Sequence, residues 1–316
     1  MTTFKEIRGT AIQSVSTDPT NPEEGQIWYN NTIGVLKGYQ LVVGTWASGG
    51  NMGTARQQLA GAGTQTAGLA FGGTILGSTG MTNTEEYDGS TWSPGGSLTT
   101  ARRFLAGAGT QTAGLAFGGR NPPPTSTNAT EEYNGSTWGP GGNLGTTRRA
   151  LAGAGTQTAG LGFGGAGSIT STEESDGSTW TAGGNLGTGR GYLAGAGIQT
   201  AALAFGGDIP PITGATEEYD GTSWTGGGNL STARGALAGC GTQTAGVAFG
   251  GAAALADTEE YNGTSWILGG NLATARGYLA GAGVQTAGLA AGGTGASAAT
   301  EEYTGSVLAT KKITTS

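Results

Sequence analysis

The sequence of 316 residues contains no histidine and one cysteine, Cys240. Histidine is the commonest general base and the commonest metal ligand, so its absence removes both roles together. A single cysteine cannot form an intramolecular disulfide, and Cys240 stands where five equivalent stretches carry alanine. We therefore expect a small packed side chain rather than a nucleophile. These absences predict a protein that is not an enzyme and uses no metal and no cofactor.

Charge and long apolar runs are also scarce. Charged residues make up 11% of the chain and the net charge is −7. Basic residues cluster no further than pairs such as Arg102-Arg103 and Lys311-Lys312, which argues against nucleic acid as a partner. The N-terminus lacks the apolar stretch of a signal peptide, and no apolar run approaches the ~20 residues of a membrane span. We expect neither a signal peptide nor a membrane-inserted segment.

The abundant residue is glycine, with 67 copies, and it belongs to a sixfold internal repeat. Each repeat carries one arginine and one tryptophan at matching places, and successive copies are 42 to 46 residues apart. A period in the forties with several short apolar segments is typical of β-propellers. We expect these residues to be structural: Arg56, Arg102, Arg148, Arg190, Arg234 and Arg276, with Trp46, Trp92, Trp138, Trp180, Trp224 and Trp266.

Four strands are predicted within each repeat. A Leu-Ala-Gly-Ala-Gly stretch follows the arginine and suits an innermost strand, because only small side chains fit near a narrow axis. A stretch such as 69–71 forms the second strand, TEEY the third and the tryptophan segment the fourth. A two-residue turn of type I′, such as Asp88-Gly89, is expected between the last two. The predicted fold is all-β: a six-bladed propeller with four antiparallel strands per blade.

The two ends of the repeat region complement each other. The last repeat carries Leu308 where tryptophan is expected, whereas Trp46 precedes the first arginine without a repeat of its own. We therefore predict that residues 42–50 complete the blade begun by residues 276–304, so that an N-terminal strand closes the last blade. The predicted boundaries are an N-terminal appendage over 1–38, the propeller over 39–308 and a surplus C-terminal tail over 309–316.

The repeat resembles the kelch family over residues 40–308. The resemblance lies in a strand ending in Gly-Gly, as at 71–73, followed by a tyrosine such as Tyr87 and a tryptophan such as Trp92. The sequence departs from the family pattern at Ser175, which replaces a tyrosine, and at Ala291, which replaces a phenylalanine. The resemblance implies a propeller. It leaves function open, because kelch proteins include scaffolds, binding modules and a few oxidases.

Residues 1–38 lie outside the repeat and predict a small β-hairpin around Asn30-Asn31. The run DPTNPEEGQIWYNNTIGVLKG resembles short segments of tail-fibre and other virion proteins of tailed bacteriophages. The resemblance is carried by Asp18, Pro19, Asn21, Pro22, Gly25, Gln26, Ile27, Trp28, Tyr29, Asn30, Leu36 and Lys37. It implies docking onto a particle, with Trp28, Tyr29 and Asn30 as candidate contacts. A hairpin that merely caps the propeller edge is the alternative.

Candidate sites divide into repeated and variable ones. Each repeat has two adjacent glutamates, which in a strand face opposite ways; we expect one to meet an arginine between blades and the other to face solvent. The loops between the second and third strands vary in length from 6 to 10 residues and lie on one face. Plain solvent-exposed loops are the alternative to binding there. The candidate binding residues are Ile75, Leu76, Met81, Arg120, Asn121, Pro122, Pro123, Pro124, Asp208, Pro210 and Pro211.

These features predict a non-enzymatic structural protein of a bacteriophage virion, of the tail-fibre or decoration type. Residues 1–40 would contact other virion proteins within a larger assembly, and the propeller would recognise a host-surface glycan or protein. Two alternatives stay open: a carbohydrate-binding, lectin-like propeller of cellular origin, and a weak glycan hydrolase.

Overall fold

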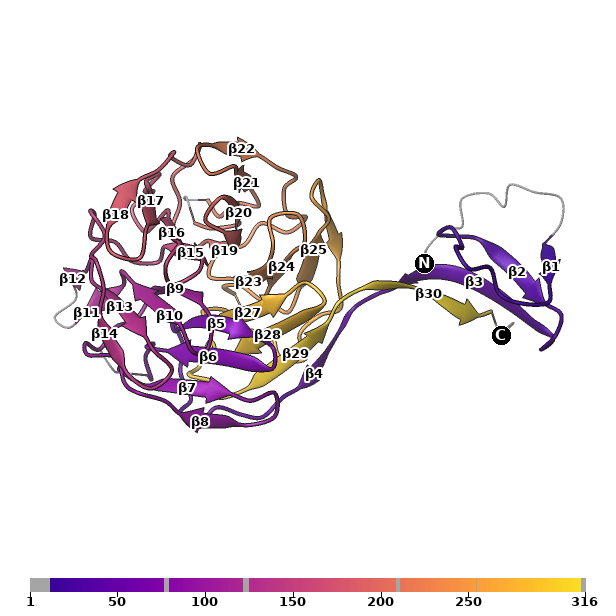
Figure 1. The fold of residues 1–316 in the computed structure, drawn as a ribbon, viewed down its shortest axis with the longest axis horizontal. Coiled ribbons are helices and arrows are strands. Elements are labelled where there is room, and N and C mark those ends of the chain that lie inside the picture. The colour runs from indigo at the N-terminus through magenta and orange to yellow at the C-terminus, as the bar shows by residue number, and fades with distance from the viewer. Residues whose placement is uncertain (1–11, 77–79, 122–124, 209–210, 254, 314–316) are drawn as a thin grey trace. The chain divides into compact units, whose positions relative to one another are not determined.

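The computed structural model describes residues 12–76, 80–121, 125–208, 211–253 and 255–313. Within these ranges the regular structure consists of strands without a helix, which confirms the all-β prediction (Figure 1). The chain divides into a larger unit, Thr45–Gly305, and a smaller one formed by Met1–Gly44 and Ser306–Ser316. The larger unit is propeller-like, with a four-stranded sheet repeated along it.

The described part of the larger unit contains six four-stranded antiparallel sheets and one two-stranded ribbon. The first three sheets comprise β5 (Ala60–Thr64), β6 (Ala67–Phe71), β7 (Thr84–Tyr87) and β8 (Trp92–Pro94); β9 (Ala106–Gly109), β10 (Gly114–Phe117), β13 (Thr130–Tyr133) and β14 (Trp138–Pro140); and β15 (Ala152–Gly155), β16 (Gly160–Phe163), β17 (Thr172–Ser175) and β18 (Trp180–Ala182). The fourth and fifth comprise β19 (Ala194–Ile198), β20 (Ala201–Phe205), β21 (Thr216–Tyr219) and β22 (Trp224–Gly226); and β23 (Ala238–Gly241), β24 (Gly246–Phe249), β25 (Thr258–Tyr261) and β26 (Trp266–Leu268).

The sixth sheet joins segments from opposite ends of the chain. It comprises β27 (Ala280–Val284), β28 (Ala287–Ala291), β29 (Thr300–Thr304) and β4 (Thr45–Ser48). Trp46 lies opposite Tyr303, which confirms the prediction that residues 42–50 join the strands of residues 276–304. The remaining ribbon pairs β11 (Arg120–Asn121) with β12 (Thr125–Ser126).

The innermost strands are neighbours in chain order, and β27 also adjoins β5. Just before each of them, one backbone N–H donates to the carbonyl of the equivalent residue in the preceding sheet. Gln58 donates to Tyr278 and Tyr278 donates to Ala236, and the series continues until it returns to Gln58. The donors and acceptors are Gln58, Phe104, Ala150, Tyr192, Ala236 and Tyr278.

Glycine permits the close approach of the innermost strands. A Cβ on Gly107 would lie 2.7 Å from the carbonyl oxygen of Gly61 in the neighbouring strand and 2.7 Å from the ring of Phe71. Real Cβ atoms do not come so close, because such contacts fall within the repulsive range of packed interiors. The small side chains expected near the axis are therefore required by strand-to-strand contact.

Aromatic side chains fill the space between neighbouring sheets. Trp224 packs against Tyr219 of its own sheet and Phe163 of the preceding one, with ring centroids 4.9 and 4.8 Å apart. Its indole N–H donates to Thr172 of the preceding sheet at 2.9 Å. Equivalent indole bonds occur at Trp46, Trp92, Trp138 and Trp266. The tryptophans thus stabilise the contacts between sheets, in line with their predicted structural role.

The turn between the third and fourth strands differs from the prediction. Tyr87 pairs directly with Trp92, so the loop has four residues rather than the two of a type I′ turn. The Asp88 carboxylate accepts hydrogen bonds from the backbone N–H groups of Ser90 and Thr91. Asparagine substitutes for aspartate in other repeats because its carbonyl oxygen accepts the same two bonds, as Asn134 does.

The smaller unit is a four-stranded sheet in the order β1 (Gln13–Val15), β2 (Ile27–Asn30), β3 (Val35–Val42) and β30 (Val307–Lys312). The hairpin predicted around Asn30 and Asn31 is present as β2 and β3. The prediction of a surplus tail over 309–316 was wrong for residues 309–312, because β30 pairs with β3 along its length. The boundaries between the two units accordingly fall at Thr45 and Gly305 rather than at 39 and 308.

Candidate functional site

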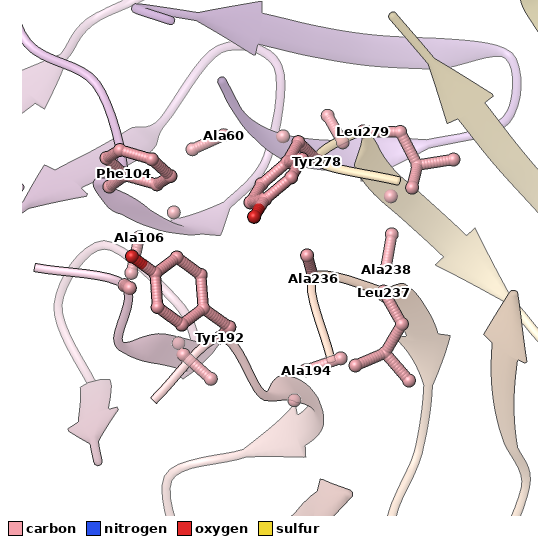
Figure 2. A pocket seen from close by; sticks show the side chains of 18 of the residues that line it. Ala60, Phe104, Ala106, Tyr192, Ala194, Ala236, Leu237, Ala238, Tyr278 and Leu279 are labelled. Carbon is pink, nitrogen blue, oxygen red and sulfur yellow. The ribbon is translucent and has the colours of Figure 1, made fainter. Parts of the chain in front are cut away.

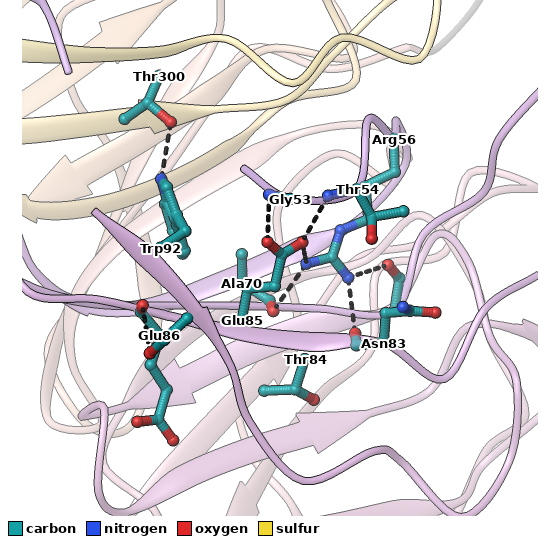
Figure 3. A network of polar contacts seen from close by, with 12 residues as sticks. Gly53, Thr54, Arg56, Ala70, Asn83, Thr84, Glu85, Glu86, Trp92 and Thr300 are labelled. Carbon is teal, nitrogen blue, oxygen red and sulfur yellow. Dashed lines mark hydrogen bonds and ion pairs between the residues drawn. The ribbon is translucent and has the colours of Figure 1, made fainter. Parts of the chain in front are cut away.

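The first glutamate of each repeated pair is buried with the repeat arginine. The Arg56 guanidinium lies 2.9 Å from Glu85 and also donates to the carbonyls of Gly72 and Asn83 (Figure 3). Burial lowers the pKa of Arg56, and the charge of Glu85 opposes that shift. The same ion pair recurs in the other repeats at 2.7 to 3.2 Å. Both partners belong to the same repeat. The predicted contact between glutamate and arginine is therefore present, but it lies within one sheet and not between neighbouring blades.

The second glutamate forms the contact between sheets. The Tyr87 hydroxyl donates to Glu302 of the preceding sheet at 2.5 Å, and Tyr133 donates to Glu86 in the same way. Burial and then this hydrogen bond raise the pKa of Tyr87 to about 12. The prediction that the second glutamate faces solvent was therefore wrong, because a tyrosine from the adjoining sheet occupies that side in five repeats. Glu132 is the exception, since Ser175 replaces the tyrosine there.

The Thr-Gln-Thr turn is also structural. The Gln111 side-chain amide donates to the carbonyls of Gly68 and Tyr87 in the preceding sheet, at 3.0 and 2.7 Å. The glutamines of the other repeats make the corresponding bonds. The repeated polar residues thus bond mainly to one another, although the Nε of each repeat arginine has no hydrogen-bond partner in the described structure. Differences in binding chemistry are therefore expected from residues that differ between repeats.

Besides the variable loops, the repeats differ at one position that lines an axial cavity of about 140 Å³. Its walls are the starts of the six innermost strands, and its most variable lining position is the residue that carries the cyclic hydrogen bonds. That residue has φ between 53° and 60° in every repeat. Figure 2 shows the lining side chains. In chain order the position is occupied by Gln58, Phe104, Ala150, Tyr192, Ala236 and Tyr278.

Three aromatic rings gather at this cavity from alternate repeats. The ring centroids of Phe104, Tyr192 and Tyr278 lie 5.6 to 6.1 Å apart in edge-to-face arrangements. Alanines at Ala150 and Ala236 leave room for them. The sequence prediction missed these aromatics, although a signal was present: the position before Leu-Ala-Gly varies among otherwise near-identical strands.

The variable loops begin at the rim of this cavity. The residue just before the variable lining position pairs through its backbone with the first residue of the loop that follows the second strand. Examples are Gln57 with Thr74, Arg103 with Arg120, and Gly191 with Asp208. The variable face and the axial cavity therefore adjoin each other.

The structure places most of the predicted loop residues. Ile75 is exposed, and Leu76 is exposed to 70%. Met81 is half-buried, and its carbonyl accepts from the Arg102 backbone N–H. Pro211 is exposed, whereas Asp208 is half-buried.

The remaining predicted loop residues divide into two groups. Arg120 and Asn121 are half-buried and form β11 at the rim. Pro122, Pro123, Pro124 and Pro210 lie outside the described residues.

The predicted docking residues share one strand but not one environment. Trp28 and Asn30 are buried and donate to the Asp18 carboxylate at 3.0 and 2.9 Å, whereas Tyr29 is 41% exposed. Hydrogen bonds from Lys37, Asn30 and Trp28 lower the pKa of Asp18 to about 2. Of the three predicted contacts, Tyr29 is therefore the accessible one.

No protein-family model matches this sequence, and no curated protein matches it. Among the described residues, no cluster of three metal-binding side chains occurs. The same residues include no helix that is long and apolar enough to cross a membrane.

Proposed function

We propose that the larger unit is a six-bladed propeller of the kelch type, closed by β4. The cycle of backbone hydrogen bonds through Gln58 and Tyr278 supports closure, and so does the pairing of Trp46 with Tyr303. On this view the variable loops and the axial cavity together form one recognition face.

The protein acts, in this proposal, as a non-enzymatic recognition module. The observation that carries it is where two kinds of side chain lie. The charged residues that recur in every repeat form bonds inside the fold, whereas residues that differ between repeats lie at the cavity and its rim. A ligand pocket commonly combines aromatic walls with a few polar groups, which suits binding. A carbohydrate-binding, lectin-like propeller of cellular origin is the second candidate, favoured by the same aromatic cavity.

The smaller unit serves as the attachment to a bacteriophage particle, of the tail-fibre or decoration type. The resemblance of the segment around Trp28 to virion proteins supports this role. Exposed apolar side chains on β3 and β30 support it further, because Leu41 lies opposite Leu308 and both are exposed. Val43 and Val307, close to them in sequence, are exposed as well, and contiguous groups of exposed apolar side chains commonly mark a contact with another protein.

Mass spectrometry of purified phage particles tests attachment. We expect the wild-type protein in particles, and we expect the L41S/L308S variant to be lost from them while remaining folded and in solution. The matched control is I267S/L268S, which changes two exposed apolar residues of β26 in the larger unit and should leave incorporation unchanged. Absence of the wild-type protein from particles, or equal incorporation of L41S/L308S, would contradict the proposal.

A further inference from the structure

Within the larger unit, the arginines outside the repeated ion pairs occupy one region. Nine arginines and no lysine lie between Thr45 and Gly305, and six of the nine form the buried pairs with glutamate. The other three are Arg103, Arg120 and Arg149, all from the second and third repeats. All three are half-buried at the start of variable loops or innermost strands.

Backbone pairing brings these three side chains to one side of a short strip. Arg103 and Arg120 exchange backbone hydrogen bonds of 3.2 and 2.8 Å, and Arg120 pairs in turn with Ser126 of β12. Residues directly opposite in antiparallel pairs project to the same face. The Arg149 guanidinium donates to the Ser126 hydroxyl at 3.2 Å, so it reaches the same strip.

Two arginines directly opposite each other oppose folding, because like charges in such cross-strand pairs are destabilising. Within the described residues, no carboxylate forms an ion pair with Arg120 or Arg149. A bound anion would neutralise the strip, and guanidinium groups are well suited to carboxylate and phosphate oxygens.

The strip adjoins the aromatic cavity. The Arg103 guanidinium carbon lies 5.7 Å from the centroid of Phe104, whose ring lines the cavity. The fourth repeat carries the opposite charge at the rim, with Asp208 at the position equivalent to Arg120. Burial raises the pKa of Tyr278, and Tyr192 and the negative charge of Asp208 raise it further by smaller amounts. The Asp208 charge therefore acts on a side chain that lines the cavity. The rim is thus positive beside Phe104 and negative beside Tyr192, because Asp208 pairs with Gly191, the residue before Tyr192.

The size of the cavity limits the occupant. Its volume of about 140 Å³ is close to the ~150 Å³ of a cavity that holds one benzene molecule. Such a space holds one six-membered ring, and the hydroxyl and carboxylate substituents of a pyranose would extend from it toward the rim. The cavity is compact and surrounded by six strands, which suits a sugar ring better than an extended acidic peptide.

We infer that the variable face binds an acidic saccharide, with one pyranose ring at the aromatic cavity and its carboxylate directed to the Arg103, Arg120 and Arg149 strip. This inference rests on the proposed function, since it names the ligand class of the proposed recognition face. Asp208 on the far side of the rim repels the carboxylate and so favours one orientation.

The test uses the full chain and three polymer probes: polygalacturonate, neutral dextran and poly-glutamate. We expect polygalacturonate to bind most tightly and its affinity to fall as salt rises. The key variant is R103Q/R120T/R149Q, which introduces residues that the first repeat carries at these positions, Gln57 and Thr74. It should fold normally and bind polygalacturonate at least about tenfold more weakly, because charge-assisted bonds are lost.

Two further variants sharpen the test. K311Q/K312Q removes two positive charges from β30 and should bind as wild type does, which controls for general attraction to an anionic polymer. Y192A/Y278A removes two of the three aromatic rings from the cavity, and it should weaken binding as well. Alanine is tolerated at this position of the repeat, since Ala150 and Ala236 occupy it in the third and fifth repeats.

Three results would each overturn the inference: equal binding by the triple arginine variant, equal loss in K311Q/K312Q, or a wild-type preference for dextran or poly-glutamate. Failure to bind any probe would overturn it too. Particle incorporation is measured separately, on residues of the smaller unit, so a failed attachment proposal is distinguishable from a failed ligand.

Discussion

At the scale of single residues, the third repeat shows what happens when one member of the shared network changes. Ser175 stands where the other five repeats have tyrosine, so Glu132 has no tyrosine hydroxyl to accept from. Trp180 packs against Phe117 but makes no indole hydrogen bond within the described structure, and the buried Thr130 hydroxyl has no hydrogen-bond partner there. The loss of the tyrosine therefore coincides with the loss of the neighbouring tryptophan bond.

Restoring the tyrosine should restore both bonds. We expect S175Y to raise the free energy of unfolding by about 1–3 kcal/mol, from a new hydrogen bond to Glu132 and a recovered one from Trp180 to Thr130. Urea unfolding of the variant beside wild type measures this. A second variant, S175Y/E132Q, should retain less of the gain because the charged acceptor is gone; a gain that is unaffected by E132Q would show that the tyrosine does not act through that contact.

At the scale of strands, the repeat pattern predicted the positions of the strands better than it predicted the side-chain contacts between neighbouring sheets. The innermost, second, third and tryptophan strands lie where spacing and small-residue patterning placed them, and Trp46 pairs with Tyr303 as expected. The contact of Glu85 with a repeat arginine was confirmed, whereas Glu86 was wrongly expected to face solvent. Alternation along a strand shows that two neighbours point apart, but it does not show what the adjoining sheet presents to either side.

The candidate site was predictable only in part. Loop-length variation correctly placed Ile75, Leu76 and Pro211 at the surface. The aromatic group of Phe104, Tyr192 and Tyr278 was missed, because its members are far apart in sequence and meet only when equivalent positions converge on one axis. Convergence of this kind depends on how sheets are arranged, which a single repeat does not encode.

The innermost strands yield a prediction about glycine. We expect G107A to lower the free energy of unfolding by about 1–3 kcal/mol, since the new methyl group would overlap the Gly61 carbonyl and Phe71. The control is G139A in β14, where an added Cβ meets no atom within 4 Å. Thermal unfolding compares the two. Equal stability of G107A and G139A would show that the strands can separate without penalty.

At the scale of the whole molecule, both units depend on segments from the two ends of the chain. The sixth sheet takes β4 from near the N-terminus and β27 to β29 from near the C-terminus, while β30 joins β3 in the smaller unit. The sequence pattern indicated the first of these pairings through the displaced Trp46. It gave no signal for the second, because β30 lies outside the repeat and lacks its anchors.

The proposed recognition face depends on closure of the larger unit by β4, because only a closed arrangement brings the six repeats together around one cavity. Urea unfolding of W46A beside W224A tests this closure most directly. Each of the two tryptophans packs against one tyrosine and one phenylalanine and donates a hydrogen bond to one threonine, so their surroundings are matched. We predict that each variant loses a similar free energy of unfolding, about 3–5 kcal/mol. A large loss in W224A, with W46A remaining as stable as wild type, would contradict closure by β4.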